Sequence, residues 1–196
     1  MKSTELKKRK RDVRKRVLAL RDAIAPEERE RLSRLVAERF LRLVEVTEAQ
    51  TVLAFWSFGS EVSTMPLMDA LHERGIRITL PRIVGADIEL RVWVPGDEMT
   101  ATAFGALEPA NGEAVLPSEI DVVATPGVAF DRTGRRVGYG GGFYDRLIPR
   151  LRPEASTVGF AFGVQLLDED LPGGSFDLRV DTVVTESETV WCRALR

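Results

Sequence analysis

The stretch that most constrains the fold is residues 120–130, "IDVVATPGVAF", which are almost continuously apolar. A strand with one solvated face alternates apolar and polar residues, so an unbroken run is typical of a strand buried on both faces of a parallel sheet. Parallel neighbours need a crossover connection between them, usually a helix. The stretch therefore predicts an α/β fold with a mostly parallel central sheet flanked by helices.

The rest of the chain alternates between the two kinds of element. Strand-type runs occupy residues 51–58, 76–83, 88–94, 157–162 and 181–186. Helical periodicity covers residues 6–24, 26–44, 65–75 and 143–151, and residues 163–170 form a helix or a turn. Turn residues dominate residues 96–119, whose proline-rich part is either a flexible loop near a site or an ordinary connection.

The length suits one hydrophobic core, so we expect residues 1–196 to form a single domain, with the two amino-terminal helices packed on one face of the sheet. No apolar run approaches the roughly 20 residues of a membrane helix. The charged amino terminus does not look like a secretory signal, and Cys192 is the only cysteine. These features predict a cytoplasmic protein without a membrane partner, and we expect a monomer.

Residues 2–21 carry ten Lys or Arg against Glu5 and Asp12. Such an excess belongs to a solvated amphipathic helix, to a nucleic-acid surface or to a site for small anionic ligands. The overall pI near 5.7 and the lack of basic clusters interleaved with aromatics argue against nucleic acid. We expect a local anionic ligand and no nucleic-acid partner.

A glycine loop, residues 135–146 with the sequence "RRVGYGGGFYDR", follows the long apolar stretch. Between a strand and a helix, such a loop presents unpaired backbone amides and the positive end of the helix dipole. Glycine removes the β-carbons that would keep an anion away from those amides. Phosphate is the natural guest, with charge added by Arg135 and Arg136, and Asp145 is placed to hold Mg²⁺ against it.

Two common phosphate motifs do not fit this loop. A Walker A sequence needs Gly-Lys-Ser/Thr, and no lysine follows Lys15. The dinucleotide fingerprint, counted from Gly138, needs a small residue at Phe143 and an acidic residue at a strand end about 20 positions later. A glycine-rich turn that only reverses the chain stays open as the alternative.

Other candidate groups are few. His72, the one histidine, lies in a predicted helix and is expected at the surface. Glu61 follows a predicted strand, where α/β proteins place binding groups, although a helix-capping or solvated acid is equally consistent with its position. Phe55, Trp56 and Phe58 cannot all face inward on one strand, so they form an aromatic wall for a flat ligand or pack in the core.

The motif "RVGYGGGFYDR" resembles the most specific element of the 5-formyltetrahydrofolate cyclo-ligase family, also called 5,10-methenyltetrahydrofolate synthetase. The resemblance covers nearly the whole chain. "KRDVRKRVLAL" is similar to the family's Lys-x-x-x-Arg start, "FWSFGSEVST" to its folate-binding strand and turn, and "FDLRVDTVVTE" to its closing segment.

The resemblance implies a set of site residues. It assigns ATP binding to the basic helix and the glycine loop, namely Lys10, Arg11, Arg14, Arg136, Val137, Gly138, Tyr139, Gly140, Gly141, Gly142, Phe143 and Tyr144. It assigns catalysis to Arg136 and Tyr144. It assigns the folate substrate to Trp56, Glu61 and Tyr144, and Mg²⁺ to Asp145 and Asp177.

The resemblance also implies a reaction between two small molecules, ATP and 5-formyltetrahydrofolate. ATP phosphorylates the formyl oxygen, nitrogen-10 attacks the activated carbon, and loss of phosphate closes the 5,10-methenyl ring. Positioning and charge neutralisation then supply most of the catalysis, and no protein nucleophile is required. Two alternatives remain: a binding paralogue without turnover, and a synthetase of the same architecture for another small acid.

Two positions depart from the family pattern. Phe143 stands where the family usually has the first of two tyrosines, which leaves Tyr144 to do the polar work. Phe176 precedes Asp177 where the family commonly has His or Asn, so the second metal ligand is the weaker assignment.

Overall fold

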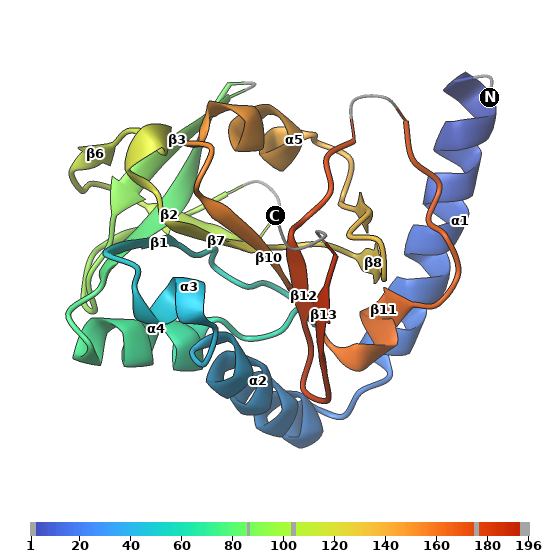
Figure 1. The fold of residues 1–196 in the computed structure, drawn as a ribbon, viewed down its shortest axis with the longest axis horizontal. Coiled ribbons are helices and arrows are strands. Elements are labelled where there is room, and N and C mark those ends of the chain that lie inside the picture. Colours follow the sequence, from blue (N-terminus) through green and yellow to red (C-terminus); the bar gives the residue numbers. More distant parts are fainter. Residues whose placement is uncertain (1–2, 86, 103–104, 175–176, 193–196) are drawn as a thin grey trace.

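The central element is a sheet of eight strands in the order β13-β12-β10-β7-β1-β2-β3-β6 (Figure 1). The computed structural model describes residues 3–85, 87–102, 105–174 and 177–192. The strands of this sheet are β1 (Thr51–Leu53), β2 (Arg77–Val84), β3 (Asp87–Val92), β6 (Ala114–Val115), β7 (Val122–Thr125), β10 (Ser156–Phe160), β12 (Thr182–Val184) and β13 (Thr189–Trp191).

Strands β12, β10, β7, β1 and β2 are parallel to one another, and the antiparallel strands β13, β3 and β6 lie at the two edges. All four residues of β7, near the middle of the sheet, are buried. This burial is what the continuous apolar run predicts, and the predicted α/β class is confirmed.

Helices cover both faces of this sheet (Figure 1). On one face lie α2 (Pro26–Phe40), α3 (Val44–Thr47) and α4 (Met65–Glu73), and on the other lies the short α5 (Phe143–Leu147). Pro26 starts α2 as expected, because a missing N–H costs nothing in the first turn. Phe40 of α2 meets Phe160 of β10 edge to face at 5.6 Å in the larger core cluster.

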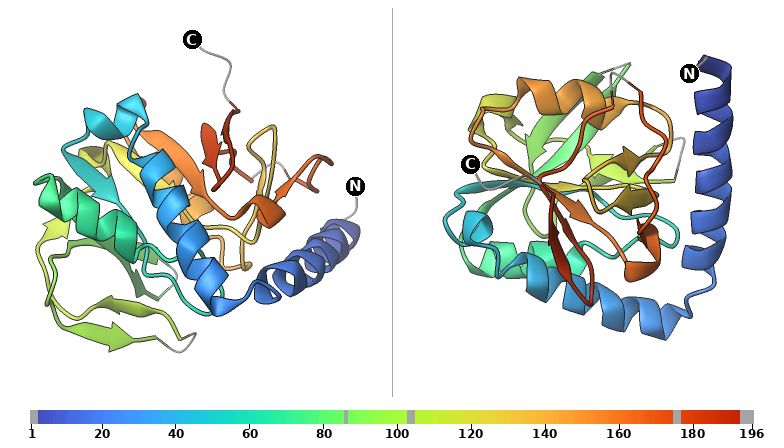
Figure 2. Two further views of the ribbon diagram at one scale, coloured as in Figure 1. Left: turned by 90° about the horizontal axis from the view of Figure 1, so that it is seen from below. Right: turned by 45° about the vertical axis from the view of Figure 1, so that its right-hand side comes forward.

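The first helix, α1 (Ser3–Asp22), does not share that face with α2. It packs against a second, three-stranded sheet made of β11 (Leu166–Leu167), β8 (Ala129–Asp131) and β9 (Arg136–Val137), as Figure 2 shows. The buried Val17 contributes to the small apolar cluster between them. Both amino-terminal helices pack on the domain as predicted, but the prediction that they share one face of the sheet is wrong, because α1 packs on the second sheet.

The second sheet exists because the predicted strand over residues 120–130 breaks in two. Strand β7 ends at Thr125, and β8 begins after Pro126 and Gly127. Proline has no N–H for a strand ladder, and a Cβ on Gly127 would lie 2.6 Å from the ring of Phe130. The chain therefore leaves the central sheet here, and the carbonyl of Pro126 becomes available to a side chain.

Three other segments differ from the prediction. Strand β1 ends at Leu53, and residues 54–64 continue as a loop. The turn-rich residues 96–119 contain a hairpin of β4 (Met99–Ala101) and β5 (Leu107–Pro109), then β6 and a 3-10 turn, Pro117–Glu119. The helix predicted over 143–151 continues from α5 as a 3-10 turn, Ile148–Arg150, and residues 163–170 hold another, Gly163–Gln165, before β11.

None of the helices in the described part of the chain has the length and apolar character needed to cross a lipid bilayer.

Candidate functional site

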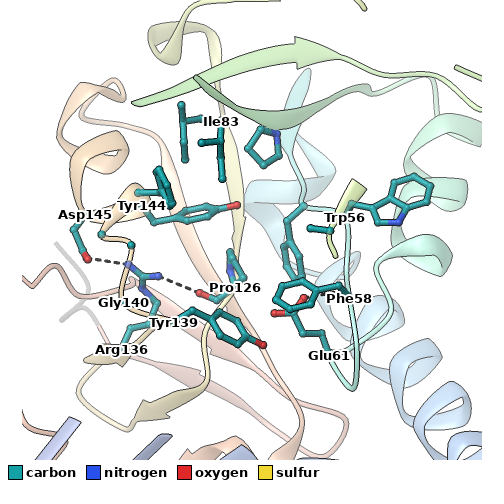
Figure 3. A pocket seen from close by; sticks show the side chains of 18 of the residues that line it. Trp56, Phe58, Glu61, Ile83, Pro126, Arg136, Tyr139, Gly140, Tyr144 and Asp145 are labelled. Carbon is teal, nitrogen blue, oxygen red and sulfur yellow. Dashed lines mark hydrogen bonds and ion pairs between the residues drawn. The ribbon is translucent and has the colours of Figure 1, made fainter. Parts of the chain in front are cut away.

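A cavity of about 400 Å³ opens beyond the carboxyl ends of β1 and β7 (Figure 3). Its walls are the loop after β1, the glycine loop, one side of α1, the middle of β2 and the β4–β5 hairpin. Ligands of open α/β sheets bind at this edge, because loops from several strands converge there. Of the turn-rich residues 96–119, the lining residues are Ala106, Leu107 and Glu108, so the cavity is bordered by the hairpin that precedes the proline-rich part.

The glycine loop forms one wall from bare backbone. Gly140 and Gly142 have φ angles of +112° and +66°, a region that residues with a β-carbon rarely adopt. Gly142 lies directly before the first residue of α5. A Cβ built on Gly140 would lie 3.7 Å from Nη2 of Arg14, and no other described residue beyond its chain neighbours comes within 4 Å. The glycines thus set the path of the loop and leave its backbone open to the cavity.

Two cations of α1 reach this wall. Arg14 Nε donates to the carbonyl oxygen of Gly138 at 2.6 Å, and Lys10 Nζ lies 2.6 and 2.5 Å from the two carboxylate oxygens of Asp177. They stand one turn apart on the helix and share a face. Arg11, predicted with them, is exposed and does not line the cavity, because the next residue points about 100° away around the helix.

Arg136 lies at the centre of the charged wall. It donates from Nη1 to the carbonyl of Pro126 at 3.2 Å and from Nη2 to Asp145 Oδ1 at 2.9 Å, and its side chain is 6% exposed. Its guanidinium carbon lies 5.6 Å from the ring centroid of Tyr144. Contacts to Pro126 and to two adjacent residues of α5 therefore fix this cation at the edge of the cavity.

Two neighbours of Arg136 point elsewhere. Arg135, proposed to add charge at the loop, donates instead to the carbonyl of Leu171 at 3.1 Å and does not line the cavity. Successive side chains on a strand point to opposite faces. Val137, predicted at the nucleotide, has its side chain fully buried in the cluster that holds α1.

Tyr144 offers a hydrogen bond to whatever occupies the cavity. Its hydroxyl is buried, points into the cavity (Figure 3) and has no hydrogen-bond partner among the described residues. Burial raises the pKa of Tyr144 above its ordinary value; Arg136 acts against that shift and the charge of Glu61 adds to it. The hydroxyl therefore stays protonated and keeps its proton to donate.

Glu61 stands on the opposite wall, in the loop after β1. Its Oε2 accepts the N–H of Phe58 at 3.1 Å, and the residue is 8% exposed. Burial raises the pKa of Glu61, opposed by the Phe58 N–H, the Tyr139 hydroxyl and the charge of Arg21. The helix-capping alternative does not apply, because α4 begins at Met65 and Glu61 bonds within its own loop.

The three aromatic residues before Glu61 all line the cavity. Trp56 packs edge to face on Trp93, with ring centroids 6.0 Å apart. The ring centroids of Phe58 and Tyr139 are 5.2 Å apart, and this contact joins the two walls of the cavity. The aromatic wall that the sequence allowed is therefore present, although Phe55 also belongs to the core.

Two further residues, one in the cavity and one buried behind it, were not predicted from the sequence. Glu108 of β5 lines the far end of the cavity beside Ile83 and lies in a segment that reads as turns. Arg21, buried behind Tyr139, follows Arg14 by seven residues, which places both on one side of a helix. That spacing was the signal for Arg21.

The two predicted metal ligands, Asp145 and Asp177, both line the cavity. Burial works against ionisation of Asp177, but the N–H of Gly174, Lys10 and Arg136 outweigh it and lower its pKa. Across the described residues there is no group of three or more His, Cys, Asp or Glu arranged to hold a metal. Phe176, the departure noted before Asp177, lies outside the described residues.

A mostly parallel α/β sheet with a cationic glycine loop facing a buried carboxylate defines a class of small-molecule binding proteins. Comparison with known proteins narrows the class. A sequence profile described as the 5-formyltetrahydrofolate cyclo-ligase family matches residues 6–186.

Proteins of that name are similar along most of their length. The 5-formyltetrahydrofolate cyclo-ligase of Escherichia coli is 36% identical over 177 residues, 87% of this chain and 96% of that protein. The one of Haemophilus influenzae is 35% identical over 150 residues, 73% and 79% of the two chains.

Solved structures agree in fold. The NMR structure of Aquifex aeolicus 5,10-methenyltetrahydrofolate synthetase has 36% identity and a TM-score of 0.84, covering 95% of this chain and 94% of that one. The synthetase of Mycoplasma pneumoniae, at 20% identity and a TM-score of 0.73, supports the fold alone; it covers 90% and 98%. The chain therefore belongs to the 5-formyltetrahydrofolate cyclo-ligase family and is an enzyme, which confirms the resemblance of its motifs.

Proposed function

We propose that this enzyme converts 5-formyltetrahydrofolate to 5,10-methenyltetrahydrofolate at the expense of ATP, which leaves as ADP and phosphate. One observation carries the proposal: a single cavity joins a cationic glycine loop to a buried carboxylate among aromatic rings. The first part suits a nucleotide and the second a flat, hydrogen-bonding ring system. Both substrates must meet in one site for phosphoryl transfer between them.

The nucleotide half is the glycine loop with α1. In this proposal the amides of the loop and the cations Lys10, Arg14 and Arg136 hold the phosphates of ATP. Arg14 already contacts the loop at Gly138, and Arg136 is fixed by contacts to Pro126 and Asp145. Cations held in place before the reaction lose little entropy when charge develops on the transferred group.

Mg²⁺ fits the proposed site through Asp145 and Asp177. Magnesium is commonly bound by one or two carboxylates together with substrate phosphates and water, so a cluster of three acidic residues is not required. Both carboxylates line the cavity and are paired with cations, Arg136 and Lys10, which a bound metal would displace or share. When bound, the ion supplies positive charge to the phosphate oxygens.

The folate half is the wall around Glu61. A carboxylate accepts two hydrogen bonds from neighbouring N–H groups, which the pterin ring presents along one edge. Trp56 and Phe58 provide apolar surface for the ring. The protonated hydroxyl of Tyr144 faces both halves and can donate to the formyl or phosphoryl oxygen.

The reaction then balances without a protein nucleophile. The formyl oxygen takes the γ-phosphoryl group, ADP leaves, and the C–N bond gains iminium character. Nitrogen-10 attacks the activated carbon, loses its proton, and the carbon–oxygen bond breaks as phosphate departs. The chain positions the reactants, neutralises charge and excludes water. None of these roles needs a nucleophilic side chain, which is consistent with a sequence that has one histidine and one cysteine.

The experiment mixes purified protein with 5-formyltetrahydrofolate and MgATP and follows the near-ultraviolet absorbance of the methenyl product. Matched reactions lack ATP or Mg²⁺. Growth of the band only in the complete mixture is expected. A folded protein that binds ATP but forms no product would move the assignment to another small acid or to a binding protein.

Three predictions from the sequence accompany this proposal: a cytoplasmic location, a monomer and a single domain. Size-exclusion chromatography coupled to light scattering tests the monomer, with a mass near 21.8 kDa expected.

A further inference from the structure

A buried arginine links the two walls of the cavity. Arg21, in the last turn of α1, is 3% exposed. Its Nε donates to Ser60 Oγ at 3.0 Å, and its Nη2 donates to the hydroxyl of Tyr139 at 2.9 Å. Ser60 precedes Glu61 in the loop after β1, and Tyr139 belongs to the glycine loop. One guanidinium therefore ties the two loops together.

The surroundings of this arginine are costly for a side chain that only fills space. Both of its hydrogen-bond acceptors are neutral hydroxyls, and its Nη1 is buried with no hydrogen-bond partner among the described residues. Burying a guanidinium without a paired carboxylate is unfavourable. An unbranched apolar side chain such as methionine would pack here without the cost of burying a charge, so the charge itself requires an explanation.

Glu61 is a buried carboxylate that feels the charge of Arg21 and has no ion pair among the described residues. The charge of Arg21 lowers the pKa of Glu61 against the effect of burial, and the Tyr139 hydroxyl, which accepts a hydrogen bond from Arg21, lowers it as well. The ring of Tyr139 rests on Phe58, whose N–H Glu61 accepts. Arg21 thus acts on Glu61 both through its field and through a hydrogen-bonded neighbour.

We propose that Arg21 is a positioning residue for the folate half of the site: it holds Glu61 and Tyr139 in register and keeps Glu61 an ionised acceptor for the substrate ring. This inference rests on the proposed function and extends it to α1. Residues 10, 14 and 21 lie within about 40° of one another around a helix of 3.6 residues per turn. One face of α1 therefore serves the nucleotide at one end and the folate at the other.

The test compares Arg21→Met and Arg21→Lys with a control on the same helix, Arg16→Met. Arg16 pairs with Glu169 at the surface, away from the cavity. For Arg21→Met we expect KM for 5-formyltetrahydrofolate to rise about 10- to 100-fold, the range for a lost hydrogen bond to a charged group, with KM for ATP within about twofold. Arg21→Lys, which keeps the charge, should recover part of the affinity, and Arg16→Met should match wild type.

A double-mutant cycle with Glu61→Gln separates positioning from general support of the fold. If Arg21 acts through Glu61, then Arg21→Met changes KM for folate little in a Glu61→Gln background, because the group it serves is gone. An arginine that merely fastens α1 gives additive losses in the two backgrounds. Additivity overturns the proposal.

The pH profile of folate KM supplies an independent readout. The ionisable and charged groups that face Glu61 are Arg21, Tyr139 and Tyr144, and Asp22 stands behind Ser60. Without Arg21 the pKa of Glu61 rises further, so the loss of folate affinity on acidification begins at a higher pH in Arg21→Met than in wild type. Superimposable profiles contradict the proposal.

If Arg21→Met does not fold, Tyr139→Phe and Ser60→Ala carry the test, since each removes one acceptor of Arg21. A rise in folate KM of about two- to tenfold is expected in both, with KM for ATP unchanged in Ser60→Ala. Unchanged folate KM in both overturns the proposal. Each series includes the wild type as a control. If the wild type forms no methenyl product, the proposed function fails, and this outcome is distinct from a failure of the proposal for Arg21.

Discussion

The two walls of the cavity bind in different ways. The wall made of the glycine loop and α1 consists of backbone and charge, and its carboxylates, Asp145 and Asp177, are already paired with cations. The opposite wall consists of aromatic and aliphatic surface around Glu61, a buried acid without an ion pair within hydrogen-bonding reach among the described residues.

The comparison shows how one site accommodates two unlike substrates. Paired charges are stable in the empty site and can exchange partners when phosphates and a metal arrive. Burying a carboxylate costs free energy until a ligand supplies hydrogen-bond donors, so the site favours a ligand with a matching hydrogen-bonding edge. The charged wall thus confers affinity for phosphate, and the apolar wall confers selectivity for the ring.

The largest effect is expected at the charged wall, where phosphoryl transfer takes place. Arg136→Met should lower kcat about 100- to 1000-fold, because a fixed cation is lost where charge develops in the transition state. Arg135→Met is the matched control, because the side chain of Arg135 points away from the cavity and donates to the carbonyl of Leu171. Steady-state kinetics at saturating substrates checks this, and equal losses in the two variants would contradict it.

The next effect belongs to the apolar wall. Glu61→Gln should raise KM for 5-formyltetrahydrofolate about 10- to 100-fold while KM for ATP changes little, because the amide carries one acceptor oxygen and repels a donor with its NH₂. Glu108→Gln sharpens the comparison, since Glu108 is the other carboxylate on the apolar side. If Glu108→Gln raises KM for 5-formyltetrahydrofolate more than Glu61→Gln does, Glu108 orients the pterin and our assignment to Glu61 is wrong.

A smaller effect is expected from the cations of α1, which are only half-buried. Lys10→Ala and Arg14→Ala should each raise KM for ATP about tenfold and leave KM for folate and the fold intact. Lys15→Ala, on the exposed side of the same helix, is the control. Unchanged ATP kinetics in both variants would remove α1 from the nucleotide site.

The smallest effect concerns stability. The pKa of Glu61 is raised in the folded state, so its contribution is most favourable below the unfolded pKa and is lost as pH rises through the folded pKa. Glu61→Gln does not titrate and should therefore raise Tm by a few degrees, about 2–4 °C, near neutral pH. Thermal unfolding at several pH values should show this gain shrinking on acidification. A gain that is constant with pH would point to packing instead of charge.

Local patterns were enough to predict much of the fold. The α/β class, the start of α2 at Pro26 and the buried strand that precedes the glycine loop follow from periodicity and from proline and glycine chemistry. The site residues with a strong local signal, the glycines and the face of Lys10 and Arg14, also lie at the cavity. The family resemblance also assigned Arg11 and Val137 to ATP binding, but Arg11 is exposed outside the cavity and Val137 is buried in the cluster that holds α1.

By itself, the sequence determined the class of fold, the glycine loop and the family, because these depend on contacts between residues close along the chain. Only the tertiary structure decided the break at Pro126 and Gly127, the sheet on which α1 packs, the hairpin with Glu108 and the hydrogen bonds from Arg21 to Ser60 and Tyr139. Each of these depends on which distant segments meet, and the free energy of such meetings comes from burial and pairing that no short window of sequence contains.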